Sequence, residues 1–281
     1  MMRGARRRLL FGLQTVLGLA RRGFFIPYAR ADVVAPPGPL EWVEARLEAA
    51  LPAFVAAMDD IDDLAPALNA IGGDPPPEPR WDQDWFPRLD AAMLYALARR
   101  RPPRRAVEVG SGHSTRFLLR ALRDGGVEAA VTAIDPAPRA DLAGLGDRLR
   151  LLRRTVQEVG RKPFEALEAG DWLVIDSSHI AMPGTDVDFL FGRILPELPP
   201  GVLLHVHDIF LPDPYPEDWA WRGYNEQLPA ALLIAGGWRP VFASRYMTTR
   251  HPDRITSSVV AGLPMPPGAR DTSLWLCREP A

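Results

Sequence analysis

The chain has 281 residues and a formal net charge of −2, which allows one substantial core and gives no overall attraction to nucleic acid. Its single cysteine, Cys277, excludes an internal disulfide framework and is typical of a reducing compartment, so we expect a cytoplasmic location. We expect this cysteine to lie in a late strand as a small hydrophobic residue.

The first thirty residues carry seven arginines and no acidic residue, which leaves about −9 on the remainder. Residues 9–20 are mostly apolar but too short to span a bilayer, which needs about 20 apolar residues. Arg21 and Arg22 follow where a signal-peptide cleavage site would have small residues. The pattern predicts that residues 1–34 form a basic amphipathic segment on an anionic membrane surface, with packing on the domain or disorder as the alternative.

Residues 35–100 are predicted to form a helical extension. Apolar residues at helical spacing favour one or two helices over residues 41–70, and glycine and proline make residues 72–79 a linker. Residues 81–98 are predicted to form a helix that leads to the first strand.

A glycine turn joins a short apolar strand to a helix. The strand covers residues 106–109, Gly110-Ser111-Gly112 forms the turn, and apolar residues at helical spacing follow over residues 115–123. A second buried strand ends at Asp135. Strand, turn, helix and strand predict a cofactor site for an adenosine compound at the carboxyl ends of parallel strands, where Asp135 would accept the ribose hydroxyls.

Two residues discriminate between adenosine cofactors. Thr115 stands where a dinucleotide fingerprint has its third glycine, and Glu108 would repel a pyrophosphate but suit a cationic amino-acid tail. A dinucleotide-dependent oxidoreductase is therefore the disfavoured alternative. A non-catalytic, membrane-tethered binding protein is a further alternative, suggested only by the basic N-terminal segment.

The remaining pattern predicts a doubly wound, mostly parallel sheet of seven strands over residues 101–281, with the last strand antiparallel. The further predicted elements are strands at 149–152, 172–175 and 202–206, a helix at 187–195, an ordered loop at 210–221, a helix at 225–235, and closing strands at 238–244 and 272–277.

Acids and histidines follow the fourth and fifth strands. Asp176 and His179 follow one, and His207 and Asp208 follow the other, so these side chains should meet near the reactive end of the cofactor. Such a group could hold a divalent cation that lowers the pKa of a substrate hydroxyl, with a histidine accepting its proton. His205 alternates with His207 and is expected to be a buried, hydrogen-bonded residue.

The segment Glu108-Val109-Gly110-Ser111-Gly112 with Ile134-Asp135 resembles the first two motifs of class I methyltransferases that use S-adenosylmethionine. The pattern of Asp176 and His179 followed by His207 and Asp208 resembles metal-dependent O-methyltransferases that act on macrolide sugars or catechol-type phenols. The resemblance implies three sets of site residues. They are, for the cofactor, Glu108, Gly110, Ser111, Gly112, Asp135, Val156, Gln157 and Asp176; for the metal, Asp176, His207 and Asp208; and for catalysis, His179 and His207.

The resemblance predicts an S-adenosylmethionine-dependent O-methyltransferase, assisted by magnesium or manganese, that acts on a sugar, a glycan or a small phenol. His207 departs from the family pattern, which has an acidic residue there. Because imidazole is a poor ligand for magnesium, the metal would be softer or His207 would lie outside its coordination shell. Polar and aromatic residues at 80–85 and 221–227 are weaker candidates for pocket walls.

Overall fold

The computed structural model describes residues 2–24, 26–142 and 144–279, and contains a seven-stranded sheet in the order β3-β2-β1-β4-β5-β7-β6. The strands are β1 (Arg105–Val109), β2 (Ala130–Ile134), β3 (Leu149–Leu152), β4 (Trp172–Ile175), β5 (Leu203–Val206), β6 (Trp238–Ala243) and β7 (Leu274–Arg278). β7 runs antiparallel to both of its neighbours. The predicted fold class is therefore confirmed, including the antiparallel last strand.

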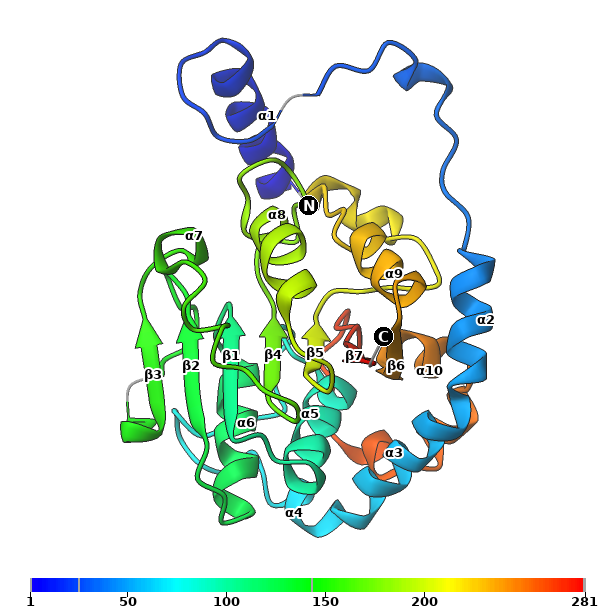
Figure 1. Ribbon diagram of the computed structural model, residues 1–281. Helices are drawn as coiled ribbons and strands as arrows, with labels where there is room; N and C mark the ends of the chain where they lie inside the picture. The colour runs from blue at the N-terminus through cyan, green and yellow to red at the C-terminus, as the bar shows by residue number, and fades with distance from the viewer. Residues whose placement is uncertain (1, 25, 143, 280–281) are drawn as a thin grey trace.

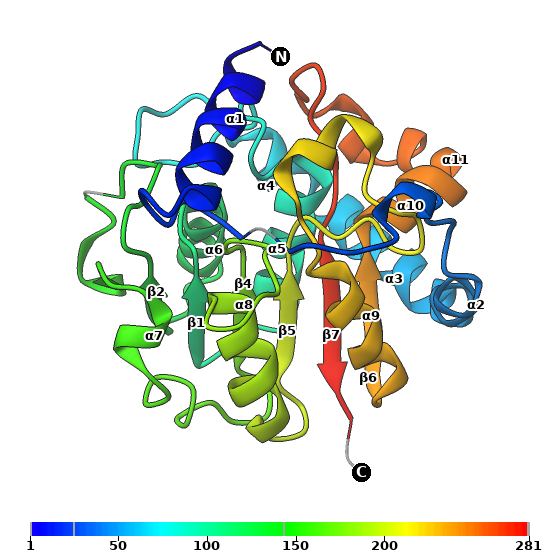
Figure 2. The ribbon, with the colours of Figure 1, turned by 90° about the horizontal axis from the view of Figure 1, so that it is seen from above.

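Helices cover both faces of the sheet, with α5 and α6 on one side and α8 and α9 on the other (Figures 1 and 2). The α-helices are α1 (Met2–Val16), α2 (Glu41–Ala49), α3 (Leu51–Asp63), α4 (Ala65–Asn69), α5 (Arg88–Arg100), α6 (His113–Asp124), α7 (Val156–Val159), α8 (Asp186–Phe189), α9 (Gln227–Ala235), α10 (Ser244–Arg250) and α11 (Pro252–Thr256). The short turns are η1 (Ala31–Val33), η2 (Gly146–Arg148), η3 (Leu190–Ile194), η4 (Leu195–Glu197), η5 (Glu217–Arg222) and η6 (Val259–Gly262).

The helical extension packs on the sheet and shares its core. Val43, Leu47 and Phe54 are fully buried, and the Phe54 ring lies 5.6 Å from that of Phe242 on β6. α5 packs along α6. Because these contacts are continuous with the core of the sheet, they hold the extension against it. The boundary at residue 100 stays a prediction.

The helix expected at residues 81–98 begins only at Arg88. The Gln83 side chain accepts hydrogen bonds from the Trp85 and Phe86 amides, at 3.0 and 2.8 Å, so residues 83–86 form a side-chain-closed turn. Pro87 then precedes the first helical residue. Here the hydrogen bonds to the Gln83 side chain compete with helix formation. The spacing of apolar residues gives no sign of these hydrogen bonds.

The connection between β6 and β7 contains α10 and α11, which were not predicted. The predicted helix at 187–195 is a short α-helix, α8, that continues as the wider turn η3.

At the other end of the chain, α1 lies beyond the carboxyl ends of the parallel strands (Figure 1). Among the described residues, no helix has both the length and the apolar character needed to cross a membrane.

Candidate active site

Four parallel strands end in register. Val109 of β1 pairs with Ile134 of β2 and Ile175 of β4, and Ile175 pairs with Val206 of β5. The next residue of each strand is therefore the first to leave the sheet at one common edge. These four residues are Gly110, Asp135, Asp176 and His207. The alignment confirms that the residues singled out in the sequence meet at the carboxyl edge.

The glycine turn requires glycine at Gly110. Its φ is +82°, and a Cβ on this residue would lie 1.7 Å from the carbonyl oxygen of Asp176. The backbone of Asp176 is held there because its amide donates to the Val109 carbonyl at 2.9 Å. A side chain on Gly110 would therefore push apart the carboxyl ends of β1 and β4.

Asp135 lies beside this turn. Its carboxylate accepts hydrogen bonds from the backbone amides of Ser111 and Ala137, each at 2.8 Å. The carboxylate also contributes to the wall of the cavity described below. This position suits the predicted contact with ribose hydroxyls, which stays a prediction.

Glu108 does not have the position that the sequence suggested. Its side chain is fully buried, and its two carboxylate oxygens accept hydrogen bonds from the hydroxyls of Ser114, at 2.6 Å, and Thr115. It does not line the cavity, so direct contact with the cationic tail of a cofactor is not what this structure shows. Instead, Glu108 fixes the first turn of α6 against β1. Burial raises its pKa to about 7, against the effect of these two hydrogen bonds.

A cavity of about 760 Å³ opens along the carboxyl edge of the sheet. Its lining includes every predicted site residue except Glu108, namely Gly110, Ser111, Gly112, Asp135, Val156, Gln157, Asp176, His179, His207 and Asp208. Trp85, Trp221 and Tyr224 from the two polar-aromatic clusters also line it. The structure thus places the glycine turn and the acid–histidine group in one cavity.

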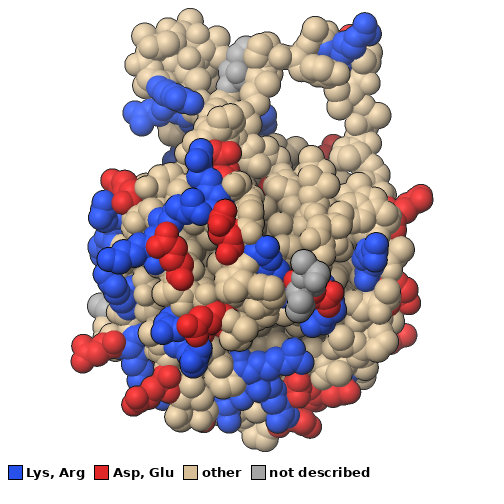
Figure 3. All heavy atoms as spheres, in the orientation of Figure 1, with Lys and Arg blue, Asp and Glu red and all other residues tan. Residues whose placement is uncertain are grey.

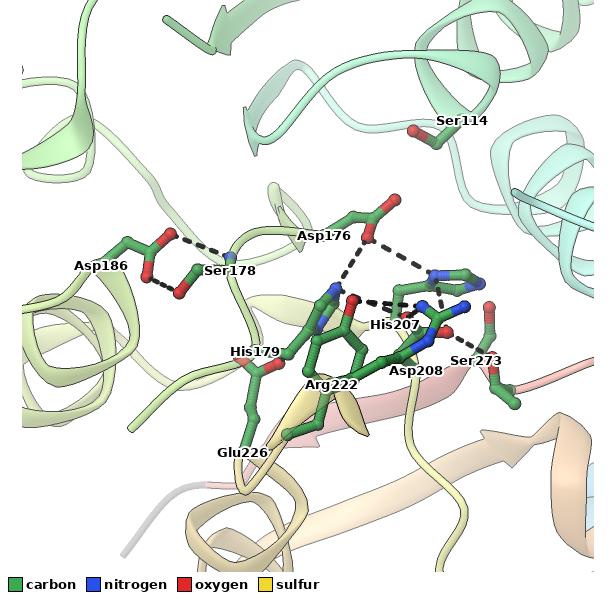
Figure 4. A network of polar contacts seen from close by, with 12 residues as sticks. Ser114, Asp176, Ser178, His179, Asp186, His207, Asp208, Arg222, Glu226 and Ser273 are labelled. Atoms are coloured by element: carbon green, nitrogen blue, oxygen red, sulfur yellow. Dashed lines mark hydrogen bonds and ion pairs between the residues drawn. The ribbon is translucent and has the colours of Figure 1, made fainter. Parts of the chain in front are cut away.

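Asp176, His179, His207 and Asp208 form a closed charge cluster (Figure 4). His179 Nε2 lies 3.3 Å from Asp176 Oδ1 and 3.5 Å from Asp208 Oδ2. His207 Nδ1 lies 3.5 Å from Asp176 Oδ1 and 3.6 Å from Asp208 Oδ1. Each imidazole therefore faces both carboxylates.

The other nitrogen of each imidazole contacts a fully buried carboxylate. Glu226 Oε2 lies 2.8 Å from His179 Nδ1, and Asp90 Oδ2 lies 3.2 Å from His207 Nε2. Asp90 also accepts hydrogen bonds from the amides of Thr272 and Ser273, which lead into β7. Such partners fix the tautomer and orientation of a histidine.

Burial opposes the charged forms in this cluster, but the opposite charges outweigh it. Burial disfavours the charge on His179, yet Asp176 and Glu226 raise its pKa well above the usual range. Burial likewise disfavours the charge on His207, but Asp176 and Asp208 raise its pKa well above the usual range. Burial would raise the pKa of Asp176, but the two histidines lower it. The histidines are thus the cations that neutralise the cluster in this structure.

Two cluster residues have left-handed backbones, with φ of 60° at His179 and 55° at Asp208. Residues other than glycine adopt this region at a cost of about 1–3 kcal/mol, and such residues concentrate at functional sites. Both residues follow the ends of β4 and β5 within four positions, and both line the cavity.

His205 is outside the cluster, as predicted. It is fully buried on β5, and its Nε2 lies 2.8 Å from the hydroxyl of Ser273. Burial and the charge on His207 lower its pKa to about 3, so it is neutral. Cys277 lies in β7, half-buried, where the prediction placed it.

The donor set fits a divalent cation in its chemistry. It comprises two carboxylates and two imidazoles, and the far nitrogen of each imidazole contacts a carboxylate, as is common for histidines that bind a metal. Nitrogen donors favour a metal softer than magnesium. Among the described residues, however, no group of three or more His, Cys, Asp or Glu side chains has the geometry of a metal site.

Sequence reasoning missed Asp90 and gave Glu226 no specific role. Asp90 lies on α5, 117 residues before His207, and no local sequence pattern indicates that the two residues meet. Arg222 lines the cavity with its guanidinium 3.8 Å from the centre of the Trp219 ring and 4.0 Å from Asp208 Oδ2. The sequence indicated Arg222 only as part of the polar and aromatic residues at 221–227, the weaker candidates for pocket walls.

Comparison with known proteins agrees with the fold and the glycine turn. Residues 107–209, from β1 to just past β5, match a family model described as a methyltransferase domain. No curated protein matches the chain significantly. The match favours a methyltransferase over a dinucleotide-dependent oxidoreductase or a non-catalytic binding protein.

Two solved structures are distantly similar. One is the S-adenosylhomocysteine-bound methyltransferase PaMTH1 of Podospora anserina, at 15% identity over 92% of this chain and 100% of that chain, with a TM-score of 0.42. The other is described as cmcI-D160 Mg-SAM, at 18% identity over 50% of this chain, with a TM-score of 0.34. This chain covers 57% of the length of that protein. The domain match indicates an S-adenosylmethionine-dependent methyltransferase, and the observed sheet order is that of the class I methyltransferase fold.

Proposed function

We propose that the enzyme transfers the methyl group to a hydroxyl oxygen of a sugar, a glycan or a small phenolic molecule. The observation that carries this proposal is the acid–histidine cluster, which lies in the same cavity as the glycine turn. A hydroxyl is a weak nucleophile until its proton is removed. The cluster offers an oriented imidazole for that task.

His179 is the residue that we assign as the proton acceptor. Its Nδ1 is held by Glu226, so Nε2 is the nitrogen that faces the cavity and the two aspartates. In this structure the surrounding carboxylates favour the protonated imidazole. To act as a base, His179 must lose that proton when another positive charge reaches Asp176 and Asp208. The sulfonium of the methyl donor brings one such charge into the cavity.

Asp176 and Asp208 are the proposed ligands of a divalent cation, with His207 as a third. When bound, such an ion would lower the pKa of a hydroxyl that it contacts. Its charge on the two carboxylates would also lower the pKa of His179. The imidazole of His207 favours a manganese-like or softer ion over magnesium. Asp90 keeps the His207 ring oriented for this role.

The acceptor side of the cavity has aromatic walls. Trp85 and Trp221 are about half exposed, and Tyr224 stacks near His179 with ring centres 4.5 Å apart. Flat apolar walls next to charged groups suit a sugar ring or a phenol. These walls support an acceptor with a ring that presents its hydroxyl to His179.

The test uses methyl-labelled S-adenosylmethionine with dihydroxybenzenes, methyl glycosides and a lipid extract of cell envelopes as acceptors. We expect label in a methyl ether with one acceptor class, and His179→Ala should slow this transfer by about 10²–10⁴-fold. S-adenosylhomocysteine affinity should stay within a few-fold of wild type, because His179 faces the acceptor. Label found on nitrogen or carbon, or full activity of His179→Ala, would overturn the proposal.

A further inference from the structure

The first part of the chain carries most of the large hydrophobic side chains that are exposed in the described residues. Of sixteen exposed large hydrophobic residues in the described part of the chain, eleven lie between residues 9 and 34. Soluble proteins scatter such residues singly, whereas contiguous apolar surface marks a contact with a membrane or another molecule. The exposed hydrophobic residues between positions 9 and 34 therefore indicate a surface that contacts a membrane or another molecule.

The apolar side of α1 faces away from the protein. Leu9, Leu13 and Val16 share one side of the helix and are 65, 50 and 58% exposed. Gln14 and Thr15, on the opposite side, are partly buried, and the Thr15 hydroxyl accepts a hydrogen bond from the Arg22 amide at 3.0 Å. A helix that packs on a domain shows the reverse arrangement, with its apolar side inward.

The charge of this segment is of one sign. Arg6, Arg7, Arg8, Arg21 and Arg22 form no ion pair with a carboxylate among the described residues, and Arg7 and Arg22 lie over the Phe11 ring, at 5.1 and 5.9 Å. Figure 3 shows the segment projecting beyond the body of the molecule, with blue and uncharged surface. Unpaired guanidinium groups beside exposed leucines are complementary to an anionic lipid surface.

The segment also lies next to the active-site cavity. α1 packs against η5, which supplies Trp219, Trp221 and Arg222 to the cavity wall. Both ribbon views show α1 beyond the edge where the parallel strands end (Figures 1 and 2). A surface that binds α1 would therefore lie close to the cavity mouth.

We propose that residues 6–24 and 26–28 dock the enzyme on an anionic lipid bilayer, so that the cavity receives an amphiphilic acceptor from that bilayer. The docking follows from the exposed apolar side and the unpaired arginines. The acceptor class rests on the proposed function and narrows it to a hydroxyl-bearing head group with a lipid-anchored tail.

Vesicle flotation of the full chain tests the docking. We expect binding to phosphatidylglycerol vesicles, little binding to pure phosphatidylcholine, and weaker binding at high salt. The double variant Leu9→Asp/Leu13→Asp should lose at least tenfold in binding. Leu228→Asp/Leu232→Asp is the matched control, since these leucines on α9 are 61 and 60% exposed, and it should bind as wild type. Equal flotation of both double variants, or a dimer that dissociates in the Leu9→Asp/Leu13→Asp protein, would overturn the proposal.

The orientation is tested by tryptophan quenching with brominated lipids. Trp221 lines the cavity from η5, the element that contacts α1, whereas Trp42 lies on α2, and they are 55 and 41% exposed. Trp221→Phe should remove a measurable share of the quenching, and Trp42→Phe should remove none. The opposite result would refute a cavity that faces the bilayer. S-adenosylhomocysteine affinity and transfer to a water-soluble acceptor, measured on the same proteins, separate failure of docking from failure of the proposed chemistry.

Discussion

His179 Nδ1 lies 2.8 Å from Glu226 Oε2, although the two residues are 47 positions apart. Glu226 is fully buried at the start of α9, so this contact is shielded from water. It fixes the imidazole so that Nε2 is the nitrogen that meets the cavity. The catalytic geometry therefore depends on a loop that the sequence connects only distantly to β4.

Replacing Glu226 by glutamine keeps the size of the side chain and removes its charge. Because the imidazole then loses its charged partner and with it part of its basicity, we expect kcat to fall by about 10–100-fold. S-adenosylhomocysteine affinity should not change, since Glu226 is outside the cavity lining. Glu217→Gln, at an exposed position of η5, is the control. A Glu226→Gln enzyme with wild-type turnover would show that the contact does not serve catalysis.

The fold could be predicted because its signals are local. The strands at 149–152 and 172–175 appear with the predicted boundaries. β4 is fully buried, as its continuous apolar run predicts, whereas β3 is a partly exposed strand at the edge of the sheet. The convergence of Asp176 and His207 also followed from the sequence, because parallel strands end at one edge.

Other parts of the site depend on contacts that no local pattern encodes. Asp90 is buried on α5, and helical spacing alone gives no reason for a carboxylate there. Glu108 was assigned to the cofactor from its position two residues before the glycine turn, whereas its hydrogen bonds to Ser114 and Thr115 are not visible in the sequence. Side-chain direction at a turn depends on backbone angles that the sequence does not show.

Asp135→Ala tests the cofactor contact. If the carboxylate accepts the ribose hydroxyls, its loss should weaken S-adenosylhomocysteine binding by roughly 1.5–3 kcal/mol, measured by isothermal titration. The exposed Asp147→Ala, in η2, serves as the control. An unchanged dissociation constant for Asp135→Ala would remove Asp135 from the cofactor site.

Chelation tests whether the enzyme needs a divalent ion. If Asp176 and Asp208 hold a divalent ion, EDTA should abolish methyl transfer and manganese should restore it better than magnesium. Titration calorimetry with manganese should show one site, which Asp208→Asn removes and Asp188→Asn, on α8, retains. Full activity of the wild-type enzyme in EDTA would leave His179 as the base of a metal-free site.

The last prediction concerns Glu108 and the dependence of stability on pH. Burial raises the pKa of this carboxyl from 4.5 to about 7 in the folded protein. The folded state therefore holds the proton more tightly than the unfolded state. Between pH 4.5 and about 7 only the unfolded state releases it, so the free energy of unfolding decreases as pH rises through this range. Outside the range Glu108 adds no further pH dependence, since below it the full contribution is present and above it the contribution has been lost. The total loss is at most about 3 kcal/mol.

Glu108→Gln cannot ionise, and its amide can keep hydrogen bonds with the hydroxyls of Ser114 and Thr115. The variant should therefore gain stability relative to wild type as pH rises from 4.5 to about 7. Urea unfolding at several pH values measures this difference, in which other buried acids such as Asp271 cancel because both proteins contain them. Glu165→Gln, at an exposed position, should follow the wild-type curve. Parallel curves for Glu108→Gln and wild type would mean that Glu108 has the same pKa in the folded and unfolded protein, so that its two hydroxyl donors offset the cost of burial.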